Sequence, residues 1–514
     1  METYDVIIIG GGYAGVTAAA VLASEEKKSV LLLEQASQLG GRAVSFRGGD
    51  ISDSESHSKI LSKAALSHIS ERSEPSFEEM IEKKMLDGYV LESGVRANWR
   101  LNRARVSRLM DFYNKSINWY TSRGFVRIAE SEDYIPLEMK SSNPPKKPEW
   151  MTDEDFMETV KVVIEQNKIA NKNVKEYDHV NLRDWLSEIT DNEKAIEWHN
   201  NRCTFHTVTN DPALNSVGED IRVNQIYASD PRCTVDNGYW GFAGAPGHQH
   251  VTDNLVDIIE LAGGKIMKSA RVQEVIINGG KAEGVIVMSE GVKQIINASS
   301  VICTVRPHEI PEILPIELLD EEYQIAAERS TKSTCLSCYM GMNKSITDFA
   351  LKPFNKRGFI WNPIIAKEEE GFKGDVPLVG VDVSAIAPTR SPEGKHLIGW
   401  AANIHNDEAT DKKKVNLIID RILEFFDTAF PDWKSATDWT MFIINHGALI
   451  WRLPEDTHPD VISRNIKGLY FAGESYGKDT SCQGTEGAVQ SALFCVESIT
   501  GNSYRKEILG DIMA

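Results

Sequence analysis

Short apolar runs and small residues alternate along the first part of the chain in a pattern typical of an α/β domain. Residues 5–9 (DVIII) form a β-branched run of strand length, which predicts a strand buried on both faces. Residues 16–24 are rich in alanine and predict a helix, and residues 29–33 (SVLLL) predict a second strand that ends at Glu34. The pattern therefore predicts that a glycine-rich turn at residues 10–15 joins the end of a strand to the start of a helix.

This turn has the glycine spacing G-x-G-x-x-G, formed by Gly10, Gly12 and Gly15. Gly10 permits the tight turn, Gly12 lets the backbone approach a pyrophosphate because it has no Cβ atom, and Gly15 lets the helix pack closely on the strand. The helix N-terminus supplies free N–H donors and the positive end of a dipole. Glu34 can accept hydrogen bonds from ribose hydroxyl groups. The segment therefore predicts a dinucleotide-binding site.

A second glycine pair follows the acid. Gly40, Gly41 and Arg42 form the sequence GGR, in which two small residues and a cation can contact a pyrophosphate from the other side. This combination resembles the extended fingerprint of FAD-binding oxidoreductases of the amine oxidase and phytoene desaturase superfamily. The resemblance covers residues 4–45 closely, and it implies FAD as the cofactor in place of a nicotinamide nucleotide.

A second resemblance lies near the other end of the chain, in residues 465–499. Residues 469–472 predict a short buried strand, which ends at Gly473 and Glu474. In the superfamily this Gly-Glu pair lies by the pyrophosphate and ribityl chain, and a following EGA sequence places a helix N-terminus against the pyrimidine end of the flavin. A positive helix end stabilises the negative charge of reduced flavin. The EGA residues here are Glu486, Gly487 and Ala488.

The middle of the chain carries a looser match. Residues 263–288 alternate β-rich runs with glycine turns, and the resemblance implies that Val272 lines the adenine pocket. The FAD site is thus built from both ends and the middle of the chain. The residues expected to contact the cofactor are Gly10, Gly12, Tyr13, Ala14, Gly15, Glu34, Gly40, Gly41, Arg42, Val272, Gly473, Glu474, Glu486, Gly487, Ala488 and Val489.

The predicted fold class is α/β, with a discontinuous Rossmann-type FAD-binding domain and an inserted α+β substrate domain. Thr152 is expected to cap a helix with acids in its first turn, and residues 106–119 have the apolar spacing of an amphipathic helix. The expected domain boundaries are 1–54, 231–307 and 456–514 for the FAD-binding domain, and 55–230 and 308–455 for the substrate domain.

Aromatic residues precede the helix that is expected after residue 247. The segment resembles the aromatic turn of phytoene desaturase-like proteins, and Tyr239, Trp240 and Phe242 are therefore candidates for a substrate tunnel. The alternative is that they belong to the core, where aromatic side chains are common.

The strand that precedes the C-terminal FAD segment runs under the flavin in this superfamily. His446, Trp451 and Arg452 are therefore candidates for the active-site wall. Cys482 lies before the EGA helix, where it could act as an acid or bond to the flavin. A satisfied core histidine and an inert cysteine are the alternatives for His446 and Cys482.

Composition excludes several classes of protein. The chain has 514 residues, enough for two or more domains, and a formal charge of −19, which disfavours binding to nucleic acid or to an anionic membrane. The seven cysteines favour a reducing, cytoplasmic location, and the C-x-x-C of Cys335 and Cys338 is read as two cysteines in a core strand. No run reaches the length that spans a bilayer, and no metal site is expected. Peripheral membrane contact through an apolar patch stays open.

The resemblance implies a FAD-dependent oxidoreductase. The branch that the chain most resembles is that of phytoene desaturase, carotenoid isomerase and retinol saturase, which implies desaturation, saturation or isomerisation of carbon–carbon bonds in an apolar organic substrate. The alternative is an amine oxidase-like enzyme, which the EGA segment favours. An escort protein for prenylated GTPases on the same fold is a third interpretation, which the intact glycine motifs disfavour. Oxygen, a quinone or a nicotinamide stay open as the electron acceptor.

Overall fold

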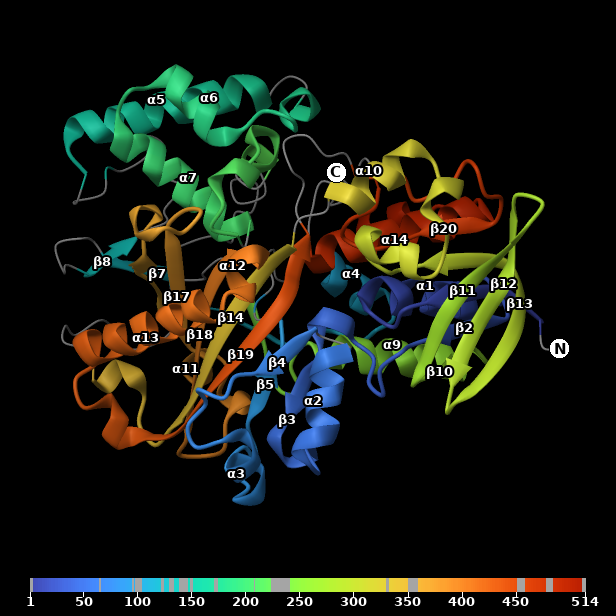
Figure 1. Cartoon of the computed structure of the whole chain (residues 1–514), viewed down its shortest axis with the longest axis horizontal. Coiled ribbons are helices and arrows are strands. Elements are labelled where there is room, and N and C mark those ends of the chain that lie inside the picture. The colour runs from blue at the N-terminus through green and yellow to red at the C-terminus, as the bar shows by residue number, and fades with distance from the viewer. Residues whose placement is uncertain are drawn as a thin grey trace.

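Two mixed β-sheets organise the molecule and lie at opposite ends of it (Figure 1). The first contains seven strands among the described residues, in the order β10-β2-β1-β13-β12-β11, with β20 also paired to β13. The computed structural model describes residues 3–63, 66–94, 97, 104–121, 124–128, 134–137, 147, 151–170, 174–207, 209–222, 241–329, 332–349, 359–450, 458–477 and 484–510. The strands of the first sheet are β1 (Thr3–Ile9), β2 (Val30–Leu33), β10 (Lys265–Met267), β11 (Ala270–Asn278), β12 (Lys281–Ser289), β13 (Val292–Cys303) and β20 (Leu469–Phe471).

This sheet collects strands from distant parts of the sequence. The central strand β1 pairs in parallel with β2 on one side and β13 on the other, so that Ile8 lies between Leu32 and Ile302. β13 also pairs in parallel with β20, which carries Leu469 opposite Val301. The sheet therefore joins the N-terminal, middle and C-terminal segments in one α/β layer.

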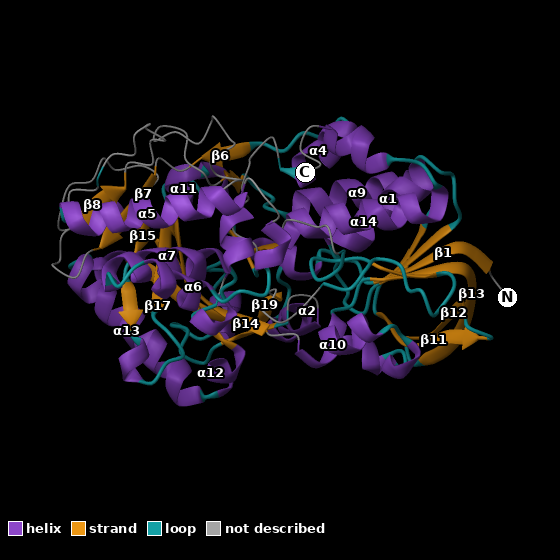
Figure 2. Cartoon of the chain, turned by 90° about the horizontal axis from the view of Figure 1, so that it is seen from above, coloured by secondary structure: helices purple, strands orange, loops and turns teal. Residues whose placement is uncertain are grey.

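Helices cover both faces of the first sheet. α1 (Tyr13–Ser24), α9 (Gln249–Leu261) and α14 (Gly484–Thr500) lie side by side on one face, and α10 (Glu321–Arg329) lies on the other (Figure 2). α1 is buried along nearly its whole length because its alanines allow close packing on the strands. α4 (Arg105–Phe112) packs against α14.

The second sheet has nine strands among the described residues, and its order is β4-β19-β14-β18-β17-β15-β7-β8, with β16 paired to β17. Even-numbered residues of β14, such as Leu336 and Cys338, pack in a core with α13 (Lys412–Ala429). Odd-numbered residues such as Cys335 lie on the other face, so the C-x-x-C is a pair of core-strand cysteines that cannot meet. The strands are β4 (Ser67–Ile69), β7 (Gly124–Ile128), β8 (Tyr134–Leu137), β14 (Lys332–Met342), β15 (Phe359–Asn362), β16 (Ile364–Ala366), β17 (Val376–Asp382), β18 (His396–His405) and β19 (Thr437–Ile450).

Two short ribbons connect the sheets, and a buried ion pair fixes them. Arg390 and Glu92 are 2.8 Å apart and almost wholly buried, and the Arg390 guanidinium also donates to the carbonyls of Val90 and Ala243. A pair this well satisfied holds both ribbons in one place, since a buried charge without its partner is costly. The ribbons are β3 (Ser45–Arg47) with β5 (Val90–Glu92), and β6 (Trp119–Thr121) with β9 (Gly241–Ala243). The short helices α2 (Ser54–Lys63), α3 (Phe77–Glu82), α11 (Val383–Ile386) and α12 (Asn406–Thr410) complete this part.

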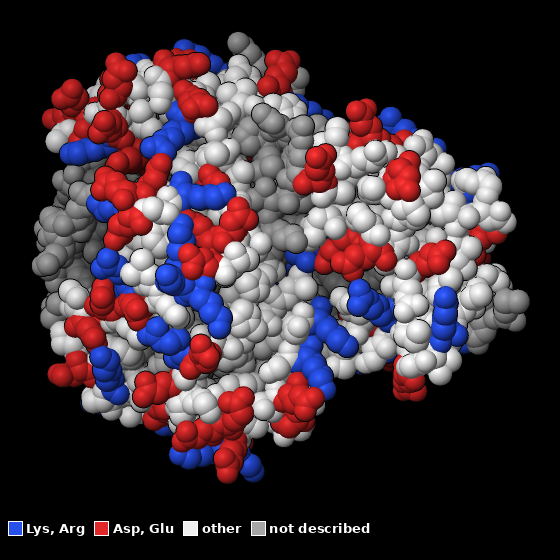
Figure 3. Space-filling view, in the orientation of Figure 1, with Lys and Arg blue, Asp and Glu red and all other residues white. Residues whose placement is uncertain are grey.

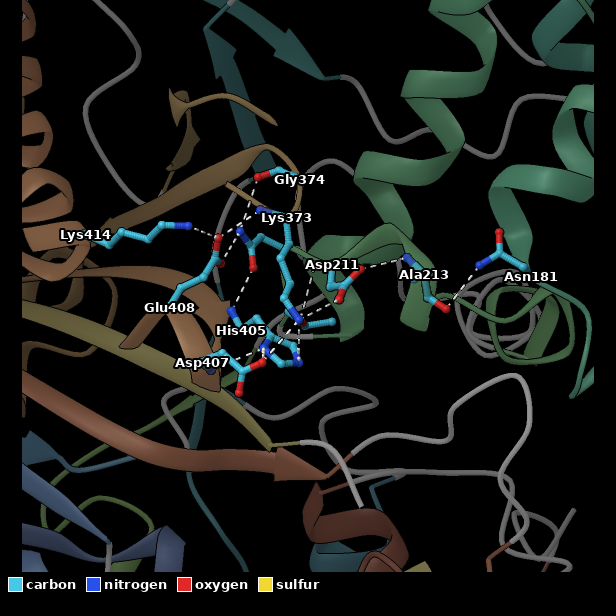
Figure 4. A network of polar contacts seen from close by, with 11 residues as sticks. Asn181, Asp211, Ala213, Lys373, Gly374, His405, Asp407, Glu408 and Lys414 are labelled. Carbon is cyan, nitrogen blue, oxygen red and sulfur yellow. Dashed lines mark hydrogen bonds and ion pairs between the residues drawn. The ribbon is translucent and has the colours of Figure 1, made fainter. Parts of the chain in front are cut away.

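A helical module, residues 151–222, has a small core of its own. It contains α5 (Asp153–Ala170), α6 (Leu182–Ile189) and α7 (Glu193–Thr207). Asn210 ties it to the second sheet: its side-chain amide donates to Glu408 at 2.8 Å and to the Gly374 carbonyl, and its oxygen accepts from the His405 N–H at 2.7 Å. Figure 4 labels these three partners, Gly374, His405 and Glu408.

The fold class predicted from the sequence is confirmed, and so are its main local features. Thr152 accepts a hydrogen bond from the Asp155 N–H at the start of α5, as an N-cap does. One element differs: the helix expected over residues 106–119 ends at Phe112. Asn114 adopts φ of +57°, which terminates the helix, and residues 119–121 pair with β9 as a strand.

Acidic and basic side chains are interspersed over the face seen in Figure 3, so the net negative charge is not gathered into one patch there. Within the described parts of the chain, none of the helices is both long enough and apolar enough to cross a membrane.

Candidate cofactor and substrate site

The turn after β1 requires glycine at two positions for reasons that lie within the protein. Gly10 has φ of +101°, and a Cβ atom there would lie 2.3 Å from Thr304 Oγ1. Thr304 donates from that oxygen to the Ile9 carbonyl at 2.7 Å, which closes the turn. A Cβ atom at Gly15 would lie 1.9 Å from the Gly10 carbonyl oxygen. These two glycines therefore let α1 begin directly on the strand end.

Gly12 is different, because nothing in the described protein requires it to lack a side chain. A Cβ atom there would meet only the Gly41 Cα, at 3.9 Å. Gly41 has φ of +55°, and the Gly40 N–H donates to the Gly11 carbonyl at 2.9 Å, so the two glycine turns lie backbone to backbone. Bare backbone beside the N-terminus of α1 is the arrangement that a pyrophosphate group requires.

Glu34 lies at the end of β2 with its carboxylate beside the first glycine turn. One carboxylate oxygen accepts from the Gly11 N–H at 2.7 Å and the other accepts from the Ala36 N–H at 2.7 Å. Burial raises the pKa of Glu34, and these backbone hydrogen bonds oppose that rise. The two carboxylate oxygens together offer about four lone pairs, and with backbone donors at Gly11, Gln35 and Ala36 the carboxylate keeps acceptor capacity for a ribose hydroxyl group.

The GGR segment is joined to the C-terminal part of the chain by an ion pair between Arg42 and Glu474. The second oxygen of Glu474 accepts from the Gly484 N–H at 3.1 Å, at the first residue of α14. Gly473 is held by Ser491, whose hydroxyl accepts from the Gly473 N–H and donates to its carbonyl, both at 2.9 Å. The two glycine turns, the Gly-Glu segment and the start of α14 therefore converge on one place.

The residues present fit a dinucleotide cofactor on two observations. The backbone at Gly12 is bare without any packing reason, and Glu34 keeps acceptor capacity for ribose. The helix N-termini of α1 and α14 add positive dipole ends where phosphate and flavin charge would lie.

Comparison with protein families supports this geometry. The model of the family described as flavin containing amine oxidoreductase matches residues 13–500, which is nearly the whole chain. The chain belongs to this family. Membership implies a flavin cofactor and an oxidoreductase activity.

Solved structures share the fold of this chain. An oxidoreductase from Methanosarcina mazei has a TM-score of 0.65 at 17% identity, over 97% of this chain and 100% of the other. A cyclohexylamine oxidase from Brevibacterium oxydans has a TM-score of 0.63 at 14% identity, over 96% and 98%. A putrescine oxidase bound to putrescine has a TM-score of 0.62 at 14% identity, over 97% and 99%. At these identities the likeness establishes the fold alone, and comparison with curated proteins found no match.

The other predicted cofactor residues lie on β11 and in the first turns of α1 and α14. Val272 is buried on β11, two residues after Ala270, whose N–H donates to the Glu34 carbonyl at 2.8 Å. The Tyr13 hydroxyl donates to the His248 carbonyl at 2.8 Å, at the start of α9. Among the remaining residues predicted to contact the cofactor, Ala14 lies in the first turn of α1, and three lie near the start of α14: Gly487, Ala488 and Val489.

Of the predicted substrate and catalytic residues, two lie within the described part of the chain. Phe242 is buried in a core cluster with Phe46 and Tyr339. His446 stacks on His68 with ring centroids 5.2 Å apart, and burial lowers the pKa of both imidazoles. The predictions for Tyr239, Trp240, Trp451, Arg452 and Cys482 concern residues outside the described ones.

The face of β19 that meets the cofactor segments carries Asn445 and not its neighbour His446. Asn445 donates from its side-chain amide to the Ser93 carbonyl at 2.9 Å. A Cβ atom at Gly94, the residue after Ser93, would lie 2.4 Å from the Arg42 carbonyl and 3.2 Å from the Asn445 amide nitrogen. Asn445 thus touches the segment next to the GGR turn, while His446 lies on the opposite face of the strand.

Sequence reasoning missed Arg105, the first residue of α4. Both oxygens of Glu486 accept from the Arg105 backbone N–H at 3.0 Å, which places α4 at the start of α14. The Arg105 side chain is fully buried, and within the described structure none of its three guanidinium nitrogens has a hydrogen-bond partner. An arginine at the start of a helix is common in sequences and does not indicate a functional site. Only the burial of its side chain, which the structure shows, singles out Arg105.

Proposed function

We propose that this chain is a FAD-dependent amine oxidoreductase that oxidises the carbon next to the nitrogen of an organic amine. The observation that carries this proposal is the family match over residues 13–500, which includes the GGR segment, the Gly-Glu segment and all of the second sheet that the structure describes. Two structural neighbours over nearly their whole length are a putrescine oxidase and a cyclohexylamine oxidase, which supports the same chemistry.

The residues of this chain would hold FAD and exclude water from the reacting atoms. Gly12, Gly41 and the start of α1 would receive the pyrophosphate, Glu34 the ribose, and the start of α14 the flavin end. When bound, FAD supplies the two-electron acceptor that takes a hydride from the substrate carbon, while one N–H proton of the amine is released and a C=N bond forms. The pairing of Arg42 with Glu474 would keep both side chains oriented at the cofactor.

The sheet face beside Asn445 favours an amine over a purely apolar substrate. Asn445 and Asn403 are buried there, and their side-chain oxygens are hydrogen-bond acceptors. An amine offers N–H donors to such acceptors, whereas a polyene offers none. Carbon–carbon desaturation, which the sequence analysis placed first, is for this reason the second candidate.

Anaerobic reduction of the bound flavin tests the proposal. The purified protein, loaded with FAD, is mixed with benzylamine, putrescine and cyclohexylamine, and separately with an apolar polyene in detergent. We expect at least one primary amine to bleach the blue absorbance of the oxidised flavin, and the polyene to leave it unchanged. Bleaching by the polyene alone would replace the proposal with carbon–carbon chemistry.

Binding and reduction of FAD distinguish the proposed enzyme from the third interpretation, an escort protein. A flavoenzyme should be purified with a flavin spectrum or acquire one when FAD is added, and its bound flavin should be reducible. A colourless protein that binds no FAD in an equilibrium titration would contradict the enzymatic proposal. Repeating amine reduction and then adding oxygen, a quinone or a nicotinamide nucleotide identifies which acceptor reoxidises the flavin.

A further inference from the structure

Three neighbouring strands of the second sheet place polar side chains in one row on one face. Cys335 on β14 lies directly opposite Asn445 on β19 and directly opposite Asn403 on β18. Directly opposite residues of antiparallel strands point to the same face, so these three side chains stand side by side. With neighbouring strands about 4.8 Å apart, the two asparagines flank Cys335 with backbones roughly 10 Å from each other. We refer to Asn445, Cys335 and Asn403 as the asparagine row.

The asparagine row faces the cofactor segments. Asn445 donates to the Ser93 carbonyl and lies next to the backbone of Arg42. Tyr339, four residues after Cys335 on the same face of β14, donates from its hydroxyl to the Glu92 carbonyl at 2.9 Å. The opposite face of these strands packs under α13. The row is therefore on the side of the sheet that is turned towards the FAD-binding segments.

Both asparagines carry an unused acceptor. Asn445 is 0% exposed and Asn403 is 6% exposed, and the side-chain oxygen of each has no hydrogen-bond partner within the described structure. For Asn445 the orientation is set, since its amide nitrogen is engaged by Ser93. Buried acceptors in proteins are nearly always paired, so two unpaired acceptors in one row indicate donors that come from a bound molecule.

We infer that the asparagine row is the amine-binding floor of the substrate site, and that it selects primary amines. This inference rests on the proposed function. A primary amine as the free base has two N–H donors, and an amino group placed above the Cys335 thiol can donate one to each asparagine oxygen. The row contains no carboxylate, so it does not favour the ammonium form, and the nitrogen lone pair that amine oxidation requires is left available.

Equilibrium binding tests the inference apart from turnover. The probe is 2-phenylpropan-2-amine, which has no hydrogen on the carbon next to nitrogen and so cannot be oxidised. Its affinity for the FAD-loaded protein is measured by titration calorimetry. We expect Asn403→Leu and Asn445→Leu each to weaken binding about tenfold, the loss of one hydrogen bond. The N,N-dimethyl counterpart of the probe should bind the wild type more weakly and bind all variants alike.

The matched control is Asn343→Leu, which makes the same substitution at an exposed residue just beyond the end of β14. This variant should bind the probe as the wild type does. Flavin absorbance and thermal melting of each variant show that the fold and the cofactor are intact before affinities are compared.

Asn403→Asp provides a second readout that a structural role would not produce. A carboxylate in the row stabilises the ammonium form and raises the pKa of the bound amine. The acid limb of the pH profile for flavin reduction by benzylamine should then move to higher pH by about one unit.

The outcomes separate the inference from the proposed function. If the wild type binds the probe and both leucine variants bind it equally well, or if the pH profile of Asn403→Asp is unmoved, the inference is overturned while amine reduction of the flavin stands. If no primary amine reduces the wild-type flavin, the proposed function fails first. Weakened probe binding in both leucine variants, with Asn343→Leu unchanged, supports the inference.

Discussion

The glycines of the cofactor turn are required for two different reasons, and substitutions can distinguish the two. Gly15 lacks a side chain because the Gly10 carbonyl occupies the place of its Cβ atom, whereas Gly12 faces no such obstacle in the described protein. The first constraint belongs to folding and the second to the ligand.

Gly12→Val should therefore yield a folded protein without FAD. Gly41→Val should also lack FAD, with additional strain within the protein, because Gly41 has a positive φ and its Cβ atom would lie 3.1 Å from the Gly12 Cα. Gly15→Val should instead lower the free energy of unfolding by about 3 kcal/mol, the upper end of overpacking costs. Flavin absorbance and chemical unfolding measure the two effects, and normal flavin content in both Gly12→Val and Gly41→Val would refute the assignment of the site.

Arg105 provides the second test at this scale. A fully buried guanidinium without hydrogen bonds destabilises the protein unless an anionic group approaches it. Arg105→Met, which is similar in length, should raise the melting temperature of the FAD-free protein and weaken FAD binding about tenfold. An unchanged FAD affinity would show that no cofactor group reaches Arg105.

Elements were predicted better than the directions of their side chains. The apolar run before Gly10, the alanine-rich helix and the strand before Gly473 all appear in the structure within a few residues of the predicted bounds. The strand that carries Asn445 and His446 is also present, as β19. The sequence could not show which of these two side chains is directed towards the cofactor segments. Successive side chains of a strand point to opposite faces of the sheet, and only the pairing of β19 with β14 determines which face each one occupies.

The packing of α2 on β3 makes stability depend on pH. His57 of α2 is buried against Phe46 with ring centroids 4.3 Å apart, and burial lowers its pKa to about 4. In the unfolded chain the imidazole has an ordinary histidine pKa near 6.5, so it takes up a proton at a higher pH than in the folded chain. The folded state therefore loses stability as the pH falls from about 6.5 towards 4. The contribution between pH 7 and pH 5 is about 2 kcal/mol.

His57→Phe should remove that share of the acid sensitivity. Urea unfolding of the wild type and the variant at pH 7 and pH 5 measures it, and the variant should lose less stability on acidification. If both proteins lose the same amount, His57 is protonated in the folded state as readily as in the unfolded one.

At the scale of the whole molecule, a buried amide is one of the contacts that join the helical module to the second sheet, beside the ion pairs of Arg183 with Glu368 and of Lys373 with Asp211. Asn210 joins residues 151–222 to Glu408 and His405, partners almost two hundred positions away in sequence. Lys414 also approaches Glu408, at 3.1 Å, and holds its carboxylate in place. No local pattern in the sequence points to such a contact, since a lone asparagine before an Asp-Pro reads as a turn.

Asn210→Leu should loosen the module without unfolding the rest. The substitution removes the donor to one oxygen of the Glu408 carboxylate, whose other oxygen keeps Lys414 and the Lys373 N–H, and it leaves the His405 N–H without its acceptor. Each group left unpaired costs about 1–3 kcal/mol. Hydrogen exchange should become faster in α5, α6 and α7 and stay unchanged in β1 and β13. Equal acceleration in both regions would show that the module and the first sheet unfold together.

The ion pair between Arg42 and Glu474 has a consequence for biosynthesis. Arg42 and Glu474 are 432 residues apart in the sequence, and β20 cannot pair with β13 until Leu469–Phe471 has left the ribosome. The nascent protein must keep its N-terminal glycine turns uncovered throughout that interval. A premature stop codon before Gly473 therefore yields a polypeptide that has the dinucleotide fingerprint and still cannot retain its cofactor.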